Sequence, residues 1–339
     1  MVADYSKKQA RDWAWATMRG VANVVNPTFT ADLSALNEKA IRYDVRKEIE
    51  YGFWGALLIA ETATTPEEYI RFTQWAADEA RGKLHLIFHA SFNTLAQNIS
   101  VARAAQEAGA ELVLLAYPAN FYARTSQDIY DYTKAFCDQI DIGVILFPVP
   151  LWGFERIHPA GMEIDLLRKL VDDVPNIVAI KAEGGMPTIG GFVETYKTLG
   201  KRVIVTSPLE WDGIPLASLV PIQFMGTSNY EFYGPTIPKM FALTQEGEFA
   251  EAMKLFWKIH PARLANLQAM SVLAGSNFLH RMLWKYQGWL QGFNGGPLRQ
   301  PTMRLVDRQV RPLRAALEQC GLNPWPEPDG DFFIGRNPA

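Results

Sequence analysis

The sequence predicts an α/β fold, a (β/α)8 TIM barrel with a small C-terminal helical extension. Three observations predict it: the chain has 339 residues, short apolar runs alternate with helical segments, and eight such runs precede residue 232. Strands of a parallel sheet are buried on both faces, so they read as nearly continuous apolar runs. The eight expected strands are 21–29, 55–60, 84–90, 112–118, 143–150, 177–181, 203–207 and 222–227.

The segments between these runs carry the signals that begin and end helices. One helix is expected to begin near Asp32, a second at Pro66 because proline is favoured at the first helical position, and a third near Asn93. Gly109 follows the amphipathic run 99–108, where a helix C-cap is expected. Alternation of strands and helices indicates a parallel sheet, either open or closed into a barrel.

The number of units favours the closed barrel. No G-x-G-x-x-G or G-x-x-x-x-G-K-[ST] segment follows the first strand, which disfavours a nucleotide-binding open sheet. After about residue 232, helical patterns at 240–260, 261–290 and 303–320 replace the strand signals. The expected organisation is a barrel over 1–231, the last barrel helix and a helical extension over 232–322, and an irregular tail over 323–339.

Composition and charge bear on partners and location. Lysine plus arginine number 33 and aspartate plus glutamate 36, a net charge of −3, which gives no reason to expect nucleic acid or an anionic membrane as a partner. The two cysteines and five histidines show no metal-ligand spacing, so no metal site is expected. The N-terminus lacks a secretory signal, and the most apolar stretch, 143–154, is too short to span a bilayer. We therefore expect a soluble cytoplasmic protein.

Lys181 ends the apolar run 176–181, and functional groups of a barrel enzyme lie at the C-terminal ends of its strands. A lysine that follows Val178 and Ile180 either extends its ammonium group to solvent or stays in an apolar surround. In the second case, desolvation lowers the pKa of the amine, and the neutral amine can attack a carbonyl to form a Schiff base. The sequence pattern leaves both interpretations open.

Several segments resemble, in order along the chain, the motifs of one enzyme family. They are Pro27-Thr-Phe-Thr, Leu36-Asn-Glu, Asp44-Val, Glu61-Thr-Ala-Thr, Ala104-Ala-Gln-Glu-Ala-Gly-Ala, Asn176-Ile-Val-Ala-Ile-Lys, Gly295-Gly-Pro-Leu-Arg-Gln-Pro and Leu313-Arg-Ala-Ala-Leu. Over about residues 20–322, the chain resembles the dihydrodipicolinate synthase and N-acetylneuraminate lyase family. The resemblance implies a (β/α)8 barrel, a Schiff base on Lys181, no metal or other cofactor, and a homo-oligomer, either tetramer or dimer. It also implies a carbonyl substrate such as pyruvate or another 2-oxo acid.

Three departures from the family's pattern bear on substrate and mechanism. Most members hold the carboxylate of the 2-oxo acid with two threonines, where this chain has Leu58 and Ile59 and keeps only Glu61. The family's proton-relay tyrosine on the fifth strand is replaced by Phe147, and an arginine that some members use for a second carboxylate is replaced by Trp152 or its neighbour Leu151. Apolar side chains can neither pair with a carboxylate nor pass a proton.

General acid–base work therefore falls to other side chains expected at the barrel mouth: Tyr117, Tyr122, His89 and Glu183 are the candidates. Tyr122 lies in the loop where the family carries a Tyr-Tyr-Asn segment, so Lys181, Tyr122 and Tyr117 form the expected catalytic set. Residues at strand ends are expected to contact the substrate: Glu61, His89, Phe147, Trp152, Glu183, Ser207, Thr227 and Asn229.

The primary interpretation is a metal-independent lyase of aldolase, hydratase-aldolase or dehydratase type. Its substrate is a small carbonyl compound, with an aromatic or apolar partner because aromatic residues gather near the expected mouth. We do not expect it to make dihydrodipicolinate. Two alternatives stay open: a non-catalytic or regulatory barrel that binds a hydrophobic ligand, and an orthodox pyruvate-dependent aldolase with rebuilt carboxylate contacts.

Overall fold

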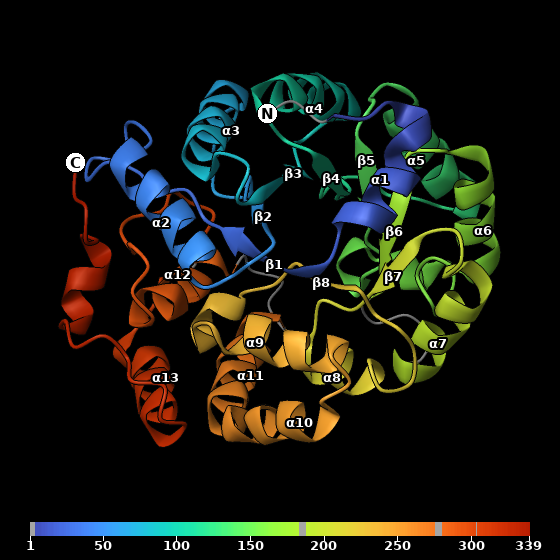
Figure 1. Ribbon diagram of the computed structural model, residues 1–339. Helices are drawn as coiled ribbons and strands as arrows, with labels where there is room; N and C mark the ends of the chain where they lie inside the picture. The colour runs from blue at the N-terminus through green and yellow to red at the C-terminus, as the bar shows by residue number, and fades with distance from the viewer. Residues whose placement is uncertain (1–3, 183–187, 275–279, 303) are drawn as a thin grey trace.

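Eight parallel strands occupy the centre of the molecule and a ring of helices surrounds them, so the predicted barrel is confirmed (Figure 1). The computed structural model describes residues 4–182, 188–274, 280–302 and 304–339. The strands within these residues are β1 Gly20–Val25, β2 Gly55–Leu58, β3 His85–Ala90, β4 Leu112–Leu115, β5 Gly143–Leu146, β6 Ile177–Lys181, β7 Ile204–Thr206 and β8 Phe224–Gly226.

Several strands end earlier than the apolar runs that predicted them. The runs continue past Val25, Leu115 and Leu146, but the chain leaves the ladder at these residues. The following residues form the βα loops, which build the C-terminal rim of a barrel and carry its functional groups. Apolar character therefore extends from the strands into the rim.

Helices follow the strands as expected, and the C-terminal ones are shorter than the sequence pattern indicates. The expected helix 240–260 divides near Gly247, whose φ of +80° is incompatible with a continuing helix. The helices are α1 Ala10–Thr17, α2 Glu38–Glu50, α3 Pro66–Ala80, α4 Leu95–Ala108, α5 Ser126–Asp138, α6 Ile164–Asp173, α7 Thr188–Leu199, α8 Glu210–Leu216, α9 Thr236–Gln245, α10 Phe249–Lys258, α11 His260–Ala274, α12 Arg281–Leu290 and α13 Asp307–Gln319.

The N-terminal helix α1 closes one end of the barrel. Its Ala10 and Ala14 pack in the same buried cluster as the inward-facing side chains of the strands. Arg11 donates from Nε to the carbonyl of Ile177 (2.9 Å) and from Nη2 to the carbonyl of Val171 (2.6 Å). Because Ile177 begins β6, these contacts place α1 at the N-terminal end of the strands. The C-terminal end is left for the mouth.

The barrel has one seam, between β7 and β8. The hydrogen-bonded order runs β7-β6-β5-β4-β3-β2-β1-β8, so these two strands stand at its ends. A side chain links them, because the Thr206 hydroxyl donates to the carbonyl of Phe224 at 2.6 Å.

The segment after α13 packs back onto the barrel. Phe332 is fully buried, with its ring 5.2 Å from that of Tyr286 and 6.1 Å from that of Trp289. The carbonyl of Ala339 accepts from the amide of Ala31 (3.3 Å), and the C-terminus lies beside α2 (Figure 1). Aromatic burial thus gives the terminal segment a fixed place.

A buried group of charged side chains, Asp44, Glu48, Glu231 and Lys285, lies between β1, α2 and α12; we call it the β1 cluster. Asn23 on β1 donates to Glu48 at 2.8 Å. The four charged side chains line a cavity of about 20 Å³, which has room for a single water molecule.

Burial shifts the titration of the β1 cluster. It raises the pKa of Asp44 to about 7 and that of Glu231 to about 8, and it lowers the pKa of Lys285 to about 7. Burial also raises the pKa of Glu48 well above its ordinary value. The carboxyl groups of Asp44, Glu48 and Glu231 therefore stay protonated in the folded protein at pH values at which solvent-exposed carboxyl groups are ionised.

Candidate active site

Lys181 is the last residue of β6 and lies at the mouth of the barrel. Its side chain is 4% exposed, and its Nζ lies 3.7 Å from the centre of the Phe147 ring. Phe147 follows β5 directly and belongs to the cluster of inward-facing side chains. The lysine amine is therefore inside the barrel, in contact with an aromatic wall.

A β-bulge in β6 turns Lys181 inward. The pairing of β5 with β6 shifts after Val144, which pairs with Ile177, because Ile145 then pairs with Ala179. Val178 is the extra residue, and both Val178 and Ala179 pack inside the barrel. Strand side chains alternate between the two faces, so an unbulged strand would direct the lysine outward, towards the helices.

A glycine on the neighbouring strand accommodates this bulge. A Cβ atom added to Gly143 would lie 2.9 Å from Cγ1 of Val178 and 3.0 Å from Cδ2 of Leu112, closer than packed carbon atoms approach. Gly143 thus leaves the space that the bulged valine fills.

Glu61 and Arg281 form an ion pair at the mouth. Glu61 lies three residues beyond β2, and Arg281 begins α12. Arg281 donates to Glu61 Oε2 from Nε at 3.1 Å and also from Nη2. Burial by itself raises the pKa of Glu61, but the charge and hydrogen bonds of Arg281, together with the nearby histidines, more than offset burial and lower this pKa to about 2. Glu61 is therefore a carboxylate at every physiological pH.

His89 lies near Oε1 of Glu61, whereas Arg281 binds Oε2. Its Nε2 is 3.9 Å from Glu61 Oε1, and the residue is 3% exposed. Two residues earlier on β3, Ile87 faces the barrel interior, so His89 faces inward as well. Burial lowers the pKa of His89 to about 4; the charges of Arg281 and Lys181 add to this and Glu61 opposes it. The imidazole is therefore neutral at neutral pH.

Two buried histidine nitrogens have no hydrogen-bond partner among the described residues, Nδ1 of His89 and Nε2 of His280. Nδ1 of His89 makes no hydrogen bond to any of the described residues, although it is shielded from solvent. An imidazole nitrogen in this state can accept or donate a proton to a small molecule bound beside it.

The two tyrosines of the expected catalytic set point elsewhere. The Tyr117 hydroxyl lies 2.6 Å from that of Thr133 on α5, and its ring packs against that of Phe154 (4.9 Å) in the layer between sheet and helices. Tyr122 is 70% exposed, with the guanidinium of Arg156 3.9 Å above its ring. Neither set of contacts brings a hydroxyl to Lys181.

The aromatic wall expected at the mouth is present. Trp152 donates from Nε1 to the carbonyl of Phe147 (2.8 Å), and the two rings meet edge to face at 6.1 Å. This hydrogen bond fixes the indole beside the phenyl ring that contacts Lys181.

The remaining substrate-side candidates differ in what they contact. Ser207 accepts from the amide of Leu209 (3.3 Å) at the start of α8, and Asn229 donates to Gln287 on α12 (2.6 Å). The Thr227 hydroxyl is buried without a hydrogen-bond partner in the described part of the chain. Glu183 lies outside the described residues.

Arg281 was missed by sequence reasoning because it belongs to no strand end. It is the first residue of a C-terminal helix, 220 positions from its partner Glu61. A lone arginine at a helix start carries no signal that it contacts the mouth.

Neither a metal-binding cluster nor a membrane-spanning helix occurs in the residues that the structure describes. In residues 4–182, 188–274, 280–302 and 304–339, no group of three or more His, Cys, Asp and Glu side chains is arranged to hold a metal ion. No helix in these same ranges has the length and apolarity needed to cross a bilayer.

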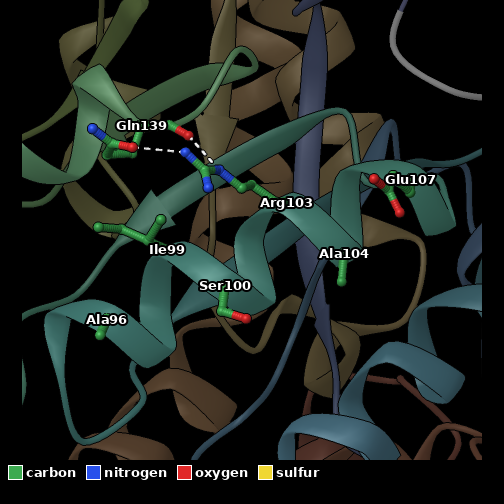
Figure 2. Close-up of a pocket in the computed structure, with 7 residues that line it drawn as sticks. All are labelled: Ala96, Ile99, Ser100, Arg103, Ala104, Glu107 and Gln139. Atoms are coloured by element: carbon green, nitrogen blue, oxygen red, sulfur yellow. Dashed lines mark hydrogen bonds between the residues drawn. The ribbon is translucent and has the colours of Figure 1, made fainter.

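A hollow of about 530 Å³ lies away from the mouth, on the outer face of α4 (Figure 2). Arg103 in its lining is already engaged, because it donates to the carbonyl (2.8 Å) and side chain (2.7 Å) of Gln139. The lining residues are Ala96, Ile99, Ser100, Arg103, Ala104, Glu107 and Gln139.

The family model of the dihydrodipicolinate synthetase family matches residues 18–320. The chain belongs to this family. It is therefore a lyase of the class I aldolase type. The match extends over all eight strands and over helices α2 to α13.

Curated relatives within the dihydrodipicolinate synthetase family are distant. An uncharacterized DapA-like lyase of Pyrobaculum arsenaticum is 24% identical over 89% of this chain and 98% of its own length. A 4-hydroxy-tetrahydrodipicolinate synthase of Chloroherpeton thalassium is 27% identical over 90% of this chain and 96% of its own length.

Solved structures from the family share the fold at lower identity. Dihydrodipicolinate synthase of Thermotoga maritima superposes with a TM-score of 0.76 at 19% identity, covering 90% of this chain and 99% of that one. N-acetylneuraminate lyase of Fusobacterium nucleatum gives 0.69 at 18%, covering 89% and 99%. These likenesses establish the barrel and its C-terminal helices, and leave the substrate to the chemistry of the site.

Proposed function

We propose that the protein is a lyase that forms a Schiff base between Lys181 and a small carbonyl substrate. The position of the amine is the main support for this proposal. It is buried at the C-terminal end of β6, inside the barrel, and its Nζ lies 3.7 Å from the centre of the Phe147 ring. A lysine amine reacts with a carbonyl in its neutral form. The neutral amine adds to the carbonyl carbon, and loss of water from the adduct leaves an iminium.

The iminium makes bonds near the former carbonyl easier to break. It accepts the electron pair of a C–C or C–H bond at the adjacent carbon, and an enamine results. Cleavage of the C–C bond is an aldolase reaction, and loss of a hydroxyl group from the next carbon is a dehydratase reaction. The proposed reaction class includes both.

The surroundings of Lys181 support a substrate with an apolar or aromatic group. Phe147 and Trp152 form the wall against which such a group would pack. At the end of β2, Ile59 faces the barrel interior, and the anionic Glu61 follows. A substrate carboxylate placed there would meet an apolar side chain and a like charge, both unfavourable. We therefore expect no synthesis of 4-hydroxy-tetrahydrodipicolinate, the activity named for some relatives.

Borohydride trapping tests the proposal. The enzyme is treated with borohydride in the presence of pyruvate, acetone or benzaldehyde, and the reduced lysine is located by peptide mass spectrometry. We expect a stable adduct on Lys181 with at least one of these probes, and none in the Lys181→Met variant.

Lys285 is the internal control for this experiment. It is also a buried lysine, and burial lowers its pKa to about 7, but it lies in the β1 cluster and donates to Pro27 and Thr28 rather than facing the mouth. An adduct on Lys285 in place of Lys181, or none with any probe, would contradict the proposal. A rise in Tm with pyruvate would favour the pyruvate-dependent alternative, because a ligand of the folded state stabilises it.

A further inference from the structure

We propose that His89 is the catalytic residue that removes and returns the proton at the carbon next to the Schiff base, with Glu61 as its charge partner. This inference rests on the proposed function and deepens it, because it assigns the acid–base step that Phe147 cannot perform. Phenylalanine has no exchangeable proton, so this step needs another side chain at the mouth.

The candidates that the sequence offered for this step are separated by their contacts. The Tyr117 hydroxyl is paired with Thr133 in the sheet–helix layer, and Tyr122 is exposed beneath Arg156. Among the candidates in the described residues, which do not include Glu183, His89 is the one whose side chain faces the barrel interior at the level of the mouth. Lys181, at the end of β6, is among the charges that act on its imidazole.

The two nitrogens of His89 suit different roles. Nε2 lies 3.9 Å from Glu61 Oε1, whereas Nδ1 is buried and makes no hydrogen bond to the described residues. The nitrogen without a protein partner is available to a substrate. A neutral imidazole has one nitrogen that accepts a proton, and burial keeps this ring neutral because it lowers the pKa of His89 to about 4.

Glu61 and Arg281 prepare the site for the charge that appears during the step. When the imidazole takes a proton it becomes a cation, and a carboxylate within 4 Å stabilises it. Arg281 holds that carboxylate in place through two hydrogen bonds to its other oxygen. Glu61 and Arg281 are thus positioning residues, since they act through His89.

The proton and electron balance closes without a further reagent. Lys181 Nζ bonds to the carbonyl carbon, and the carbonyl oxygen leaves as water, which takes one proton from the amine and one from solvent. His89 then takes a proton from the adjacent carbon, while the C–H electron pair forms the C=C bond of the enamine and neutralises the iminium nitrogen. In the reverse direction, the imidazolium returns the proton to that carbon, and hydrolysis releases the ketone.

Deuterium exchange tests the assignment with simple probes. In D2O, the parent enzyme should replace the methyl hydrogens of acetone or pyruvate by deuterium. Proton NMR follows this exchange as the loss of the methyl signal. We expect the His89→Gln variant to lose about 100-fold or more of this exchange rate, the usual effect of losing a general base. The borohydride adduct on Lys181 should persist, and added imidazole should partly restore exchange in the His89→Ala variant.

The same strand supplies a matched control. His85 begins β3 at the opposite end of the barrel and pairs with a carboxylate too, since its Nδ1 lies 2.8 Å from Glu111 Oε2. His85→Gln should leave both the exchange rate and the adduct unchanged.

Each other outcome has a distinct meaning. Exchange at the parental rate in His89→Gln, with the adduct present, would overturn the role of His89 and leave the proposed function intact. Loss of the adduct in a folded His89→Gln protein would place His89 in Schiff-base formation and overturn its assignment to the α-proton. Absence of any adduct in the parent enzyme would overturn the proposed function and this inference together.

Discussion

At the scale of single residues, one partly buried and one buried carboxylate bind arginine, and their surroundings shift their pKa values in opposite directions. Glu61 pairs with Arg281 at the mouth, and Glu210 on α8 pairs with Arg263 on α11 (Nε to Oε1, 2.9 Å). Burial raises the pKa of Glu210, whereas at Glu61 the charge and hydrogen bonds of Arg281 and the nearby histidines together offset burial and lower the pKa to about 2. Glu61 is therefore the carboxylate whose negative charge the fold stabilises.

Glu61→Gln should lower the free energy of unfolding by about 3 kcal/mol at neutral pH, because Arg281 stays buried without a counter-charge. The folded pKa of Glu61 is about 2, below its ordinary 4.5. Its contribution is thus present above the ordinary pKa and is lost as pH falls towards 2. Urea denaturation of both proteins at about pH 7 and about pH 3 measures this.

Glu210→Gln serves as the control for position. This substitution removes the buried carboxylate that pairs with Arg263 at a site away from the mouth. It should therefore lower the free energy of unfolding and leave the deuterium exchange rate unchanged. Equal unfolding free energies for Glu61→Gln and the parent at neutral pH would show that the mouth pair does not stabilise the fold.

At the scale of secondary-structure elements, the bulge in β6 decides whether the lysine faces the mouth. The register shift between Val144 and Ile145 adds Val178 to the inward face. Ala179 therefore also faces inward, and so does Lys181, two residues later. Gly143 on β5 makes the space for that extra side chain. Two neighbouring strands thus jointly set the direction of one catalytic group.

Gly143→Ala should destabilise the fold by about 2 kcal/mol, because its Cβ would press on Val178 at 2.9 Å. It should also reduce the yield of borohydride adduct, since β6 must shift to relieve the contact. Val178→Ala removes the obstructing Cγ atoms. The free energy of unfolding of the double variant should therefore exceed, by about 1 kcal/mol, the value obtained by adding the two single effects in a double-mutant cycle. Strictly additive effects of the two substitutions on the free energy of unfolding would mean that Gly143 does not accommodate the bulge.

The sequence allowed the elements to be predicted better than the directions of their side chains. Strands buried on both faces are continuously apolar, so all eight could be found, and the strand-end rule placed Lys181, His89 and Phe147 at the mouth. A bulge leaves no mark in an apolar run, and alternation no longer applies after a strand ends. Tyr117 was therefore expected at the mouth, although its hydroxyl contacts α5, and Arg281 was not expected there at all.

At the scale of the whole molecule, the β1 cluster joins segments that are far apart in the sequence. Lys285 on α12 donates to the carbonyl of Pro27 and the hydroxyl of Thr28, both at 2.7 Å, in the loop that follows β1. Asp44 on α2 accepts from the amide of Asn294 (2.6 Å). The charge state of this cluster therefore affects how the C-terminal helices hold the barrel.

Glu231 in this cluster should make the protein less stable as the medium becomes alkaline. Burial raises its pKa from 4.5 to about 8, so the folded state binds the proton more tightly than the unfolded chain. The stabilising contribution is complete below pH 4.5 and disappears as pH rises through about 8. Glu231→Gln keeps the shape and removes the titration.

The difference in Tm between parent and Glu231→Gln, measured from about pH 5 to about pH 9, should fall steadily as pH rises. Taking the difference cancels the titration of groups common to both proteins, such as His89, whose lowered pKa acts in the opposite direction at acidic pH. A constant difference over the whole range would mean that Glu231 has an ordinary pKa.

The seam between β7 and β8 determines where the barrel opens first. Strands such as β3 have a ladder on each side, whereas the seam is joined by the Thr206 hydroxyl on the Phe224 carbonyl. Parting the two strands there breaks no ladder, so the least costly sub-global fluctuation unrolls the sheet from this line. Amides of β7 and β8 should exchange with deuterium faster than those of β3, and Thr206→Val should speed them further. Since β7 also pairs with β6, such unrolling would begin one strand away from Lys181, the proposed Schiff-base lysine.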